Sequence, residues 1–468
     1  MAYRTTNPAT GEVEKSFDTI NDAALAAVLD EAERCYREDW PLRPVEDRSA
    51  IIKRAAAIIR DEQQVLAETM SRDMGKLVLQ AIGELQLSAA ILDYYADTAA
   101  EFLTPKPLPD APGATLHPQP LGILLAVEPW NFPFFQLARV AGPQLMVGNV
   151  MVAKHASNVP QCALAFEDVM RRAGVPAGAY ANLFVTTDQI GTIIDDPRVR
   201  GVTLTGSEKA GASVAERAAR NLKKSVLELG GSDPMIVLED APVEATVLNA
   251  MVGKMNNTGQ SCVATKRMIV VGEERGRIFL EAMKAAMGSL KPGDPLDPAT
   301  SLGPVSSEGA LQGLLTQIEQ AKASGAEVAL GGSRIDRAGS YLEPTILTNI
   351  SKENPVYAQE IFGPVLSFYV VPDEAAAIAL ANDVPFGLGG SVFTADLERG
   401  KRLALAIESG MAFVNNPTWS TPQMPFGGIK NSGYGRELSQ LGFGEFVNWK
   451  LVAVSAAGAL PPGADAAG

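Results

Sequence analysis

The residue with the clearest chemical potential in this chain is Cys262, which closes the segment NTGQSC at residues 257–262. A free thiol is mostly protonated near neutral pH, so a nucleophilic cysteine needs a neighbouring base or a positive field. Histidine is the usual base, but the chain has only two, His117 and His155. The segment LELGG offers the carboxylate of Glu228 instead. We expect Glu228 to act as the base; the alternative is that Cys262 is a buried, inert cysteine.

The composition is that of an ordinary folded protein with an excess of acidic groups. The chain has 468 residues, enough for two or three domains, and 46% of them are apolar while 20% are charged. Lysine and arginine number 40 against 54 acids, which gives a net charge of −14. This balance argues against nucleic acid or an anionic membrane as the main partner. It still allows a small anionic substrate at a local positive site.

Cysteine and histidine usage narrows the chemistry further. The three cysteines, Cys35, Cys162 and Cys262, are widely spaced and include no C-x-x-C pair, so we expect neither a disulfide framework nor a metal site. Free thiols fit a reducing, cytoplasmic setting. The first residues lack the apolar core of a signal peptide. The longest early uncharged run, 14 residues between Arg139 and Lys154, is too short to span a bilayer.

Helical periodicity dominates the first hundred residues. Apolar side chains recur at helical spacing from residue 47 to residue 70, and a similar pattern runs from 77 to 102. Residues 74–76 interrupt the pattern and predict a break between two helices. The next segment, residues 104–120, contains six prolines and is expected to be an extended arm or connection.

From residue 121 onwards, short apolar runs alternate with helical patterns. This alternation predicts an α/β fold in which helices cover both faces of a parallel sheet, with sites at the carboxyl ends of the strands. The expected strands are residues 121–127, 150–153, 181–185, 202–204 and 225–229, then 268–271, 365–371, 391–394 and 412–415. The expected helices are residues 161–173 and 209–221, then 245–256, 275–288, 311–324, 374–382 and 397–407.

Seven short motifs occur in a fixed order along nearly the whole chain. They are PWNFP at 129–133, Lys154, TGS at 205–207, ELGG at 228–231, GQSC at 259–262, EIFGP at 360–364 and PFGG at 425–428. Their order resembles that of the NAD(P)-dependent aldehyde dehydrogenases. The resemblance implies an aldehyde-dehydrogenase-like α/β fold. Its implied parts are a Rossmann-type cofactor domain (1–101 and 121–230), an α/β catalytic domain (231–444), a small oligomerisation element (102–120 and 445–458) and a flexible tail (459–468).

Aldehyde oxidation through a covalent intermediate makes definite demands on three residues. Cys262 would attack the carbonyl carbon, and the resulting oxyanion needs hydrogen-bond donors. The side-chain amide of Asn131 and the backbone N–H of Cys262 are the expected donors. A base must then activate water to hydrolyse the thioester, a role that we assign to Glu228. The apolar neighbours of Glu228 favour a partly buried carboxylate with a raised pKa.

Cofactor binding is expected in the first α/β block. Gly206 and Gly211 place a tight turn before a helix, whose N-terminal amides suit a pyrophosphate. Many NAD-selective relatives carry glutamate where this chain has Ser157, so the resemblance favours NADP with NAD tolerated. It also implies one set of cofactor contacts: Ser207 with phosphate, Lys154 with the adenosine ribose, Glu360 with the nicotinamide ribose, and Trp130, Leu229 and Phe362 as further members.

Within the family, the segments around Lys154 and Glu228 are similar to those of bacterial succinate-semialdehyde dehydrogenases. That similarity implies a substrate carboxylate held by Arg139, with Thr421 supplying a hydroxyl. Some of these enzymes have a second arginine where this chain has Asn256, so one charged carboxylate contact is absent and Asn256 is expected to contact the substrate with at most a neutral hydrogen bond. The alternatives are another small or medium aldehyde, transfer of the acyl group to coenzyme A, or a non-catalytic binding protein. The resemblance also implies a homodimer or homotetramer.

Overall fold

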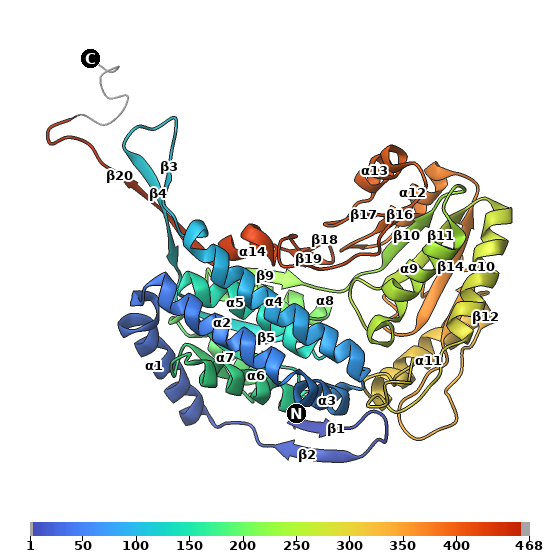
Figure 1. Cartoon of the computed structure of the whole chain (residues 1–468), viewed down its shortest axis with the longest axis horizontal. Helices are drawn as coiled ribbons and strands as arrows, with labels where there is room; N and C mark the ends of the chain where they lie inside the picture. Colours follow the sequence, from blue (N-terminus) through green and yellow to red (C-terminus); the bar gives the residue numbers. More distant parts are fainter. Residues whose placement is uncertain (1–2, 460–468) are drawn as a thin grey trace.

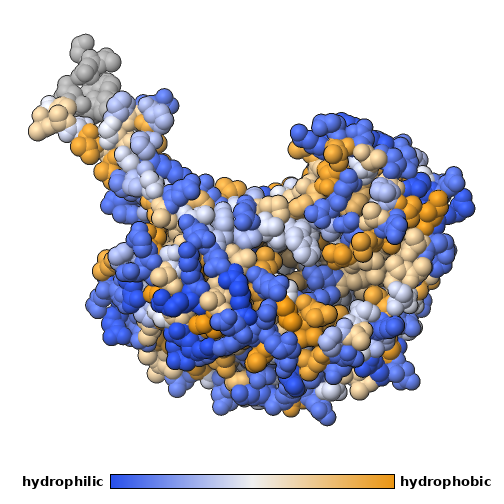
Figure 2. All heavy atoms as spheres, in the orientation of Figure 1, coloured by the Kyte–Doolittle hydropathy of each residue, from blue (hydrophilic) through white to orange (hydrophobic). Residues whose placement is uncertain are grey.

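Two β-sheets, each covered by helices, form the two lobes of the molecule in Figure 1. The structure is a computed structural model, and it describes residues 3–459. A narrow three-stranded sheet projects from the first lobe as an arm, and Figure 2 shows the concave surface between this arm and the second lobe. The α/β fold predicted from the sequence is confirmed. The predicted tail, residues 459–468, lies outside the described residues apart from residue 459.

The first lobe is built on a six-stranded sheet in the order β19-β9-β8-β5-β6-β7. All neighbouring strands are parallel except β19, which runs antiparallel to β9. The strands are β5 (Ile123–Glu128), β6 (Val150–His155), β7 (Tyr180–Asn182), β8 (Val199–Thr205), β9 (Lys224–Glu228) and β19 (Gly433–Tyr434). The helices are α1 (Asp22–Glu38), α2 (Val45–Asp61), α3 (Gln63–Met74), α4 (Val78–Phe102), α5 (Pro133–Val147), α6 (Pro160–Ala173), α7 (Thr187–Asp195), α8 (Glu208–Arg220) and α14 (Ser439–Gly444).

The second lobe is built on a seven-stranded sheet in the order β12-β13-β14-β11-β10-β16-β17. Only the β12–β13 pair is antiparallel. The strands are β10 (Asp233–Val237), β11 (Thr265–Val271), β12 (Glu327–Leu330), β13 (Thr345–Thr348), β14 (Val365–Val371), β16 (Ser391–Phe393) and β17 (Phe413–Val414). The helices are α9 (Val243–Met255), α10 (Glu273–Gly288), α11 (Glu308–Ala323), α12 (Glu374–Asn382) and α13 (Leu397–Ala406).

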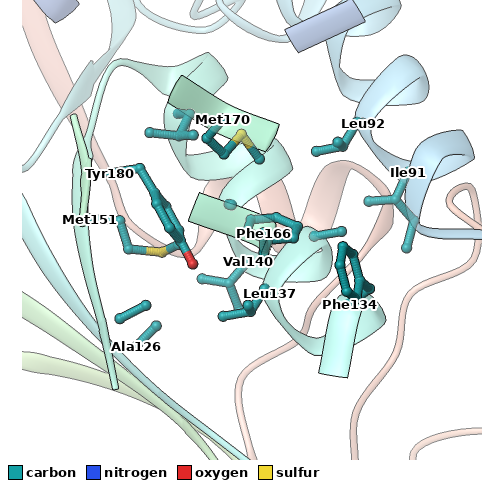
Figure 3. Close-up of a cluster of buried hydrophobic side chains, with 14 of the residues drawn as sticks. Ile91, Leu92, Ala126, Phe134, Leu137, Val140, Met151, Phe166, Met170 and Tyr180 are labelled. Atoms are coloured by element: carbon teal, nitrogen blue, oxygen red, sulfur yellow. The ribbon is translucent and has the colours of Figure 1, made fainter. Parts of the chain in front are cut away.

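The core of the first lobe joins its helices to its sheet. Figure 3 shows aromatic and aliphatic side chains from α4, α5 and α6 meeting residues of β6 and β7. The rings of Phe134 and Phe166 lie 5.8 Å apart, and those of Phe166 and Tyr180 lie 5.4 Å apart. Burial of each such side chain contributes roughly 1.5–3 kcal/mol. This packing fixes the start of α5, which carries several of the motif residues.

The predicted helix break is present, whereas several elements were not predicted, among them the helices α5 and α7 and the strands β10, β12 and β13. α3 ends at Met74, Gly75 adopts a left-handed conformation with φ of 83°, and α4 begins at Val78. α5 carries Arg139 and ends inside the uncharged run that contains Pro143. All fifteen of its residues are buried, so it lacks the polar face that marks a helix in sequence. β10 follows the glycine pair directly, and its five buried residues show no alternation.

The arm is an antiparallel sheet of β3 (Lys106–Pro107), β4 (Ala114–Pro120) and β20 (Val447–Ala453), in the order β20-β4-β3. The two segments assigned to an oligomerisation element therefore pair with each other, from Val447 opposite Pro120 to Ala453 opposite Ala114. The domain boundaries themselves stay a prediction. Residues 433–434, which we had grouped with the second lobe, pair with β9 of the first sheet.

Among residues 3–459, no single helix has both the length and the apolar character needed to cross a membrane. Helices α3 and α4 meet that test only as a pair bent by 118°. Both belong to the helical layer of the first lobe, where α4 packs against α2 and α5.

Candidate active site

The strands of the first sheet end together, and the motif residues follow their carboxyl ends. Glu128 at the end of β5 lies opposite His155 at the end of β6, and Thr205 at the end of β8 lies opposite Glu228 at the end of β9. The PWNFP, Lys154, TGS and ELGG motifs therefore meet at one edge, as expected for a parallel sheet. Among residues 3–459, no group of three His, Cys, Asp or Glu side chains is arranged to hold a metal ion.

Cys262 lies at the end of a turn with an unusual backbone. Asn257, Thr258 and Gly259 all have positive φ values, of 53°, 55° and 75°. Asparagine and glycine tolerate this region, but a β-branched threonine does so only under strain. A side chain at Gly259 is impossible, because its Cβ would lie 2.1 Å from the carbonyl oxygen of Gly363. The GQSC motif thus needs its glycine for close approach to the segment that follows Phe362.

Hydrogen bonds fix this turn against the end of β5. The Asn257 side-chain amide donates to the carbonyl oxygen of Asn131 at 2.8 Å. The Asn131 amide in turn donates to the carbonyl oxygen of Gln260 at 3.2 Å. The Gln260 side chain accepts from the backbone N–H of Ser306 at 2.8 Å. The predicted partners Asn131 and Cys262 are therefore brought together, with the Asn131 amide beside the residues that precede the thiol.

Two buried charged side chains that we did not predict, Lys76 and Glu84, hold the backbone of Asn131 and the start of α5 in place. The Lys76 ammonium donates to the Asn131 carbonyl oxygen at 2.8 Å and forms an ion pair with Glu84. Glu84 also accepts from the first backbone N–H groups of α5, those of Phe134 at 2.8 Å and Phe135 at 3.1 Å. Glu84 thereby supplies the negative charge that a helix N-terminus favours. The sequence signal for this role was the position of Glu84, an acidic residue among the apolar residues on the buried face of α4.

A cavity of about 330 Å³ opens in front of Cys262. Most of its walls are apolar, and none of the described residues that line it is a lysine or an arginine. Asn256, predicted to contact substrate, is in the wall. The lining residues are Gln80, Gly83, Glu84, Leu87, Phe132, Phe135, Gln136, Val252, Gly253, Asn256, Ser261, Cys262, Val263, Thr418, Trp419, Ser420 and Phe426.

Two substrate-binding assignments need correction. Arg139 does not face the cavity: its guanidinium is fully buried, forms an ion pair with Glu437 and donates to the Thr205 hydroxyl at 2.9 Å. It lies behind the cavity wall, 5.0 Å and 4.7 Å from the ring centres of Phe135 and Phe426. Because α5 was not predicted, nothing in the sequence indicated the direction in which the Arg139 side chain points. Thr421 is also outside the wall formed by the described residues, in which Ser261, Thr418 and Ser420 supply the hydroxyls.

Glu228 belongs to a buried group of three carboxyls around Arg139. Burial raises the pKa of Glu228 well above its ordinary value, and the charge of Glu437 raises it further, while Arg139 opposes both effects. Glu128, the third member, has a raised pKa for the same two reasons. Neither oxygen of Glu228 has a hydrogen-bond partner among the described residues. The carboxyl can therefore take up and release a proton, and it holds that proton to an unusually high pH.

The Cys262 thiol is likewise unfavourable to ionise in this state. Burial raises its pKa to about 12, although the positive charges of Lys266 and Arg139 act in the opposite direction. The negative charges of Glu360 and Glu228 raise the pKa as well. Glu228 is thus close enough to act on the thiol electrostatically, although 34 residues separate them in sequence. Both predicted catalytic groups favour their neutral forms here.

The residues predicted to bind the nicotinamide end of a cofactor also surround the Cys262 turn. The rings of Trp130 and Phe362 lie 5.8 Å apart and perpendicular. The Glu360 carboxylate accepts from the backbone N–H of Gly231 at 3.1 Å and pairs with the Lys266 ammonium at 2.9 Å. A Cβ on Gly230 would lie 2.5 Å from this carboxylate, so the glycine pair makes room for Glu360.

The residues predicted to bind the pyrophosphate lie around the start of α8. The Ser207 hydroxyl caps this helix by accepting from Ala210 N–H at 3.3 Å, which leaves earlier N–H groups available to an anion. Gly206 follows the end of β8, and a Cβ on Gly211 would lie 2.6 Å from the Leu229 side chain.

Lys154 and Ser157 follow at the end of β6. The Lys154 ammonium lies 5.9 Å from the Tyr3 ring centre, and burial lowers its pKa. Ser157 lines a second, polar cavity of about 790 Å³ with Arg4, and its carbonyl oxygen accepts from the Arg4 backbone N–H at 3.0 Å.

Replacing Arg139 with alanine should destabilise the fold, because it leaves Glu437 buried without its cation. Breaking a buried ion pair from one side costs about 3–5 kcal/mol. Urea unfolding should therefore show a clearly lower midpoint for Arg139→Ala than for the wild type. Arg171→Ala is the matched control, since its pair with Asp168 is exposed and should matter little. Equal midpoints for wild type and Arg139→Ala would show that Arg139 is not buried in this pair.

Comparison with known proteins agrees with this geometry. The model of the aldehyde dehydrogenase family matches residues 1–452. A succinate-semialdehyde dehydrogenase [NADP(+)] of Deinococcus radiodurans is 47% identical over 96% of this chain and 94% of its own length. The crystal structure of succinic semialdehyde dehydrogenase from Streptococcus pyogenes, in complex with NADP+, superposes with a TM-score of 0.95 at 46% identity over 97% of this chain and all of that one. The chain therefore belongs to the aldehyde dehydrogenase family.

Proposed function

We propose that this chain oxidises succinic semialdehyde to succinate with NADP+, through a thioester on Cys262. The observation that carries the proposal is a thiol in a cavity wall, with the bonded Asn131 amide beside its turn and the buried Glu228 carboxyl acting on it electrostatically. The substrate and the cofactor of the relatives from Deinococcus radiodurans and Streptococcus pyogenes support the choice of both. NAD+ is expected to be tolerated as a weaker cofactor.

The first half of the reaction builds a thioester on Cys262. The Cys262 thiol gives its proton to water, the sulfur bonds to the aldehyde carbon, and the carbonyl oxygen becomes an oxyanion. The second N–H of the Asn131 amide and the backbone N–H of Cys262, which has no acceptor among residues 3–459, are the donors for this oxygen. Bound NADP+ would accept the hydride lost from the same carbon.

The second half needs a base, and Glu228 is suited to it. The carboxylate takes a proton from water as the water oxygen bonds to the thioester carbon. The carbon–sulfur bond then breaks and releases the acid and the thiolate. Because the pKa of Glu228 is raised, its basic form becomes more abundant as the pH increases, so hydrolysis should accelerate towards alkaline pH. Transfer to coenzyme A would not need this carboxylate, which favours water as the acceptor.

The residues around the two sheets fit a dinucleotide. The N-terminus of α8, opened by Gly206 and Ser207, would hold the pyrophosphate, with Gly211 and Leu229 packed behind it. Glu360 would take the nicotinamide ribose, beside Trp130 and Phe362. Lys154 and Ser157 would face the adenosine ribose, where a serine in place of the glutamate of many NAD-selective relatives allows a 2′-phosphate.

Recognition of the substrate carboxylate would rely on neutral donors. Arg139 is engaged with Glu437, so we assign this role to the amide of Asn256 and the hydroxyl of Ser420, both in the cavity wall. Neutral donors give weaker discrimination than an arginine fork. The apolar walls therefore also favour a second candidate, an uncharged aldehyde of similar length.

We also infer a homodimer or homotetramer in the cytoplasm. β20 is an edge strand of the arm and carries the exposed side chains Trp449, Leu451 and Val452. An exposed edge of this kind favours pairing with another chain. The three cysteines are all free thiols, which suits a reducing compartment.

Replacing Cys262 with alanine tests the proposed function directly. The wild type should reduce NADP+ with succinic semialdehyde and do so faster than with butanal, whereas Cys262→Ala should be inactive with both. The buried Cys35→Ala and Cys162→Ala variants are matched controls that should retain activity. Turnover by Cys262→Ala would exclude the mechanism. A wild-type preference for butanal would replace the succinate-semialdehyde assignment with the second candidate.

Replacing Ser157 with glutamate should reverse the cofactor preference. A carboxylate beside the 2′-phosphate costs several kcal/mol of repulsion, so kcat/KM for NADP+ should fall by at least about tenfold relative to NAD+. Ser157→Ala, which removes the hydroxyl without adding charge, should change the ratio much less. An unchanged ratio in Ser157→Glu would mean that the adenosine ribose does not lie at residue 157.

A further inference from the structure

Lys266, the second residue of β11, has a buried side chain that contacts both the nucleophile turn and Glu360. Its ammonium donates to the carbonyl oxygens of Ser261 at 2.7 Å and Cys262 at 2.6 Å. Its third partner is the Glu360 carboxylate at 2.9 Å. An ammonium has three N–H donors, so these three acceptors satisfy it completely. The side chain is only 2% exposed, which means that water cannot replace any of these partners.

The surroundings hold Lys266 in this position. The Phe362 ring centre lies 5.7 Å from the ammonium. A Cβ on Gly231 would lie 2.6 Å from the Cys262 carbonyl oxygen, so the glycine lets the nucleophile turn approach the segment that binds Glu360. The backbone N–H of Gly231 also donates to Glu360. The turn, the glycine pair and Glu360 therefore form one packed unit with the ammonium at its centre.

Four charged groups act on the Cys262 thiol: Lys266 and Arg139 favour its ionisation, while Glu360 and Glu228 oppose it. Arg139 is committed to its pair with Glu437. Lys266 exerts the larger of the two favourable effects, and its carboxylate partner is partly exposed, at 21%. The charge that reaches the thiol from Lys266 therefore depends on how strongly Glu360 neutralises it.

We propose that Lys266 is a positioning residue that fixes the main chain at Cys262 and transmits the charge state of Glu360 to the thiol. Binding of ribose hydroxyls by Glu360 would draw the carboxylate's charge away from Lys266 and so favour the thiolate when cofactor is present. This inference rests on the proposed function only in taking Glu360 as the ribose ligand.

Alkylation of Cys262 by iodoacetamide, followed across pH by mass spectrometry of its peptide, tests the proposal without turnover. In Lys266→Met, Cys262 should be alkylated about tenfold more slowly than in the wild type at any pH below the thiol pKa. The reason is that a rise of one unit in the thiol pKa lowers the thiolate fraction tenfold. Glu360→Gln should label faster than the wild type. In the Lys266→Met background the same Glu360→Gln change should have a smaller effect, since the cation between them is missing.

Two variants separate charge from folding. Lys266→Arg keeps the positive charge, so the pH at which half of its Cys262 reacts as thiolate should stay near that of the wild type. Lys322→Met removes an exposed lysine paired with Glu319 and should change nothing. If Lys266→Met does not fold, Glu360→Gln and Lys266→Arg carry the test.

Three results would overturn the proposal: an unchanged alkylation profile in folded Lys266→Met, no acceleration in Glu360→Gln, or equal effects of Glu360→Gln in both backgrounds. If the wild type and its variants follow the expected alkylation pattern but the wild type oxidises no aldehyde, the proposed function is wrong and the role of Lys266 stands.

Discussion

One backbone oxygen joins the two lobes at the site. The carbonyl of Asn131 accepts from the buried Lys76 ammonium and from the Asn257 side chain. Asn131 follows the last residue of β5 in the first sheet, whereas Asn257 precedes β11 in the second. Both donors are buried, and a buried donor without a partner is costly, so the second lobe cannot shift against the first without a penalty for breaking the Asn257 bond. The relative position of the Asn131 amide and the Cys262 thiol follows from this constraint.

The electrostatics of the site rest on two buried cations that are already paired. Arg139 lies among the carboxyls of Glu128, Glu228 and Glu437, and Lys266 pairs with Glu360. Burial is the largest effect on the pKa of Cys262 and keeps the thiol neutral, while Lys266 and Arg139 act against burial and Glu360 and Glu228 act with it. A small redistribution of charge on substrate or cofactor binding can therefore change its reactivity. This arrangement explains how a cysteine without a histidine partner can still be activated.

The sequence predicted the α/β architecture because the alternation of strands and helices can be read from short stretches of residues. It predicted the grouping of the motifs because the carboxyl ends of parallel strands always meet at one edge of the sheet. It did not predict α5 or β10, since both are buried on all sides and lack a polar pattern. It assigned Arg139 to the substrate carboxylate, whereas the structure pairs Arg139 with Glu437, a partner almost 300 residues away that local sequence does not reveal. Lys76, Glu84 and Lys266 were missed for the same reason: their partners are set by tertiary packing.

The most direct test of the account is to trap the intermediate on Cys262 in Glu228→Gln. Rapid mixing with succinic semialdehyde and NADP+ should give a stoichiometric burst of NADPH followed by slow turnover. Mass spectrometry of the quenched protein should show a succinyl group on the Cys262 peptide, which the wild type should not accumulate if hydrolysis is fast. Wild-type turnover in Glu228→Gln without this adduct would contradict the assignment of both residues.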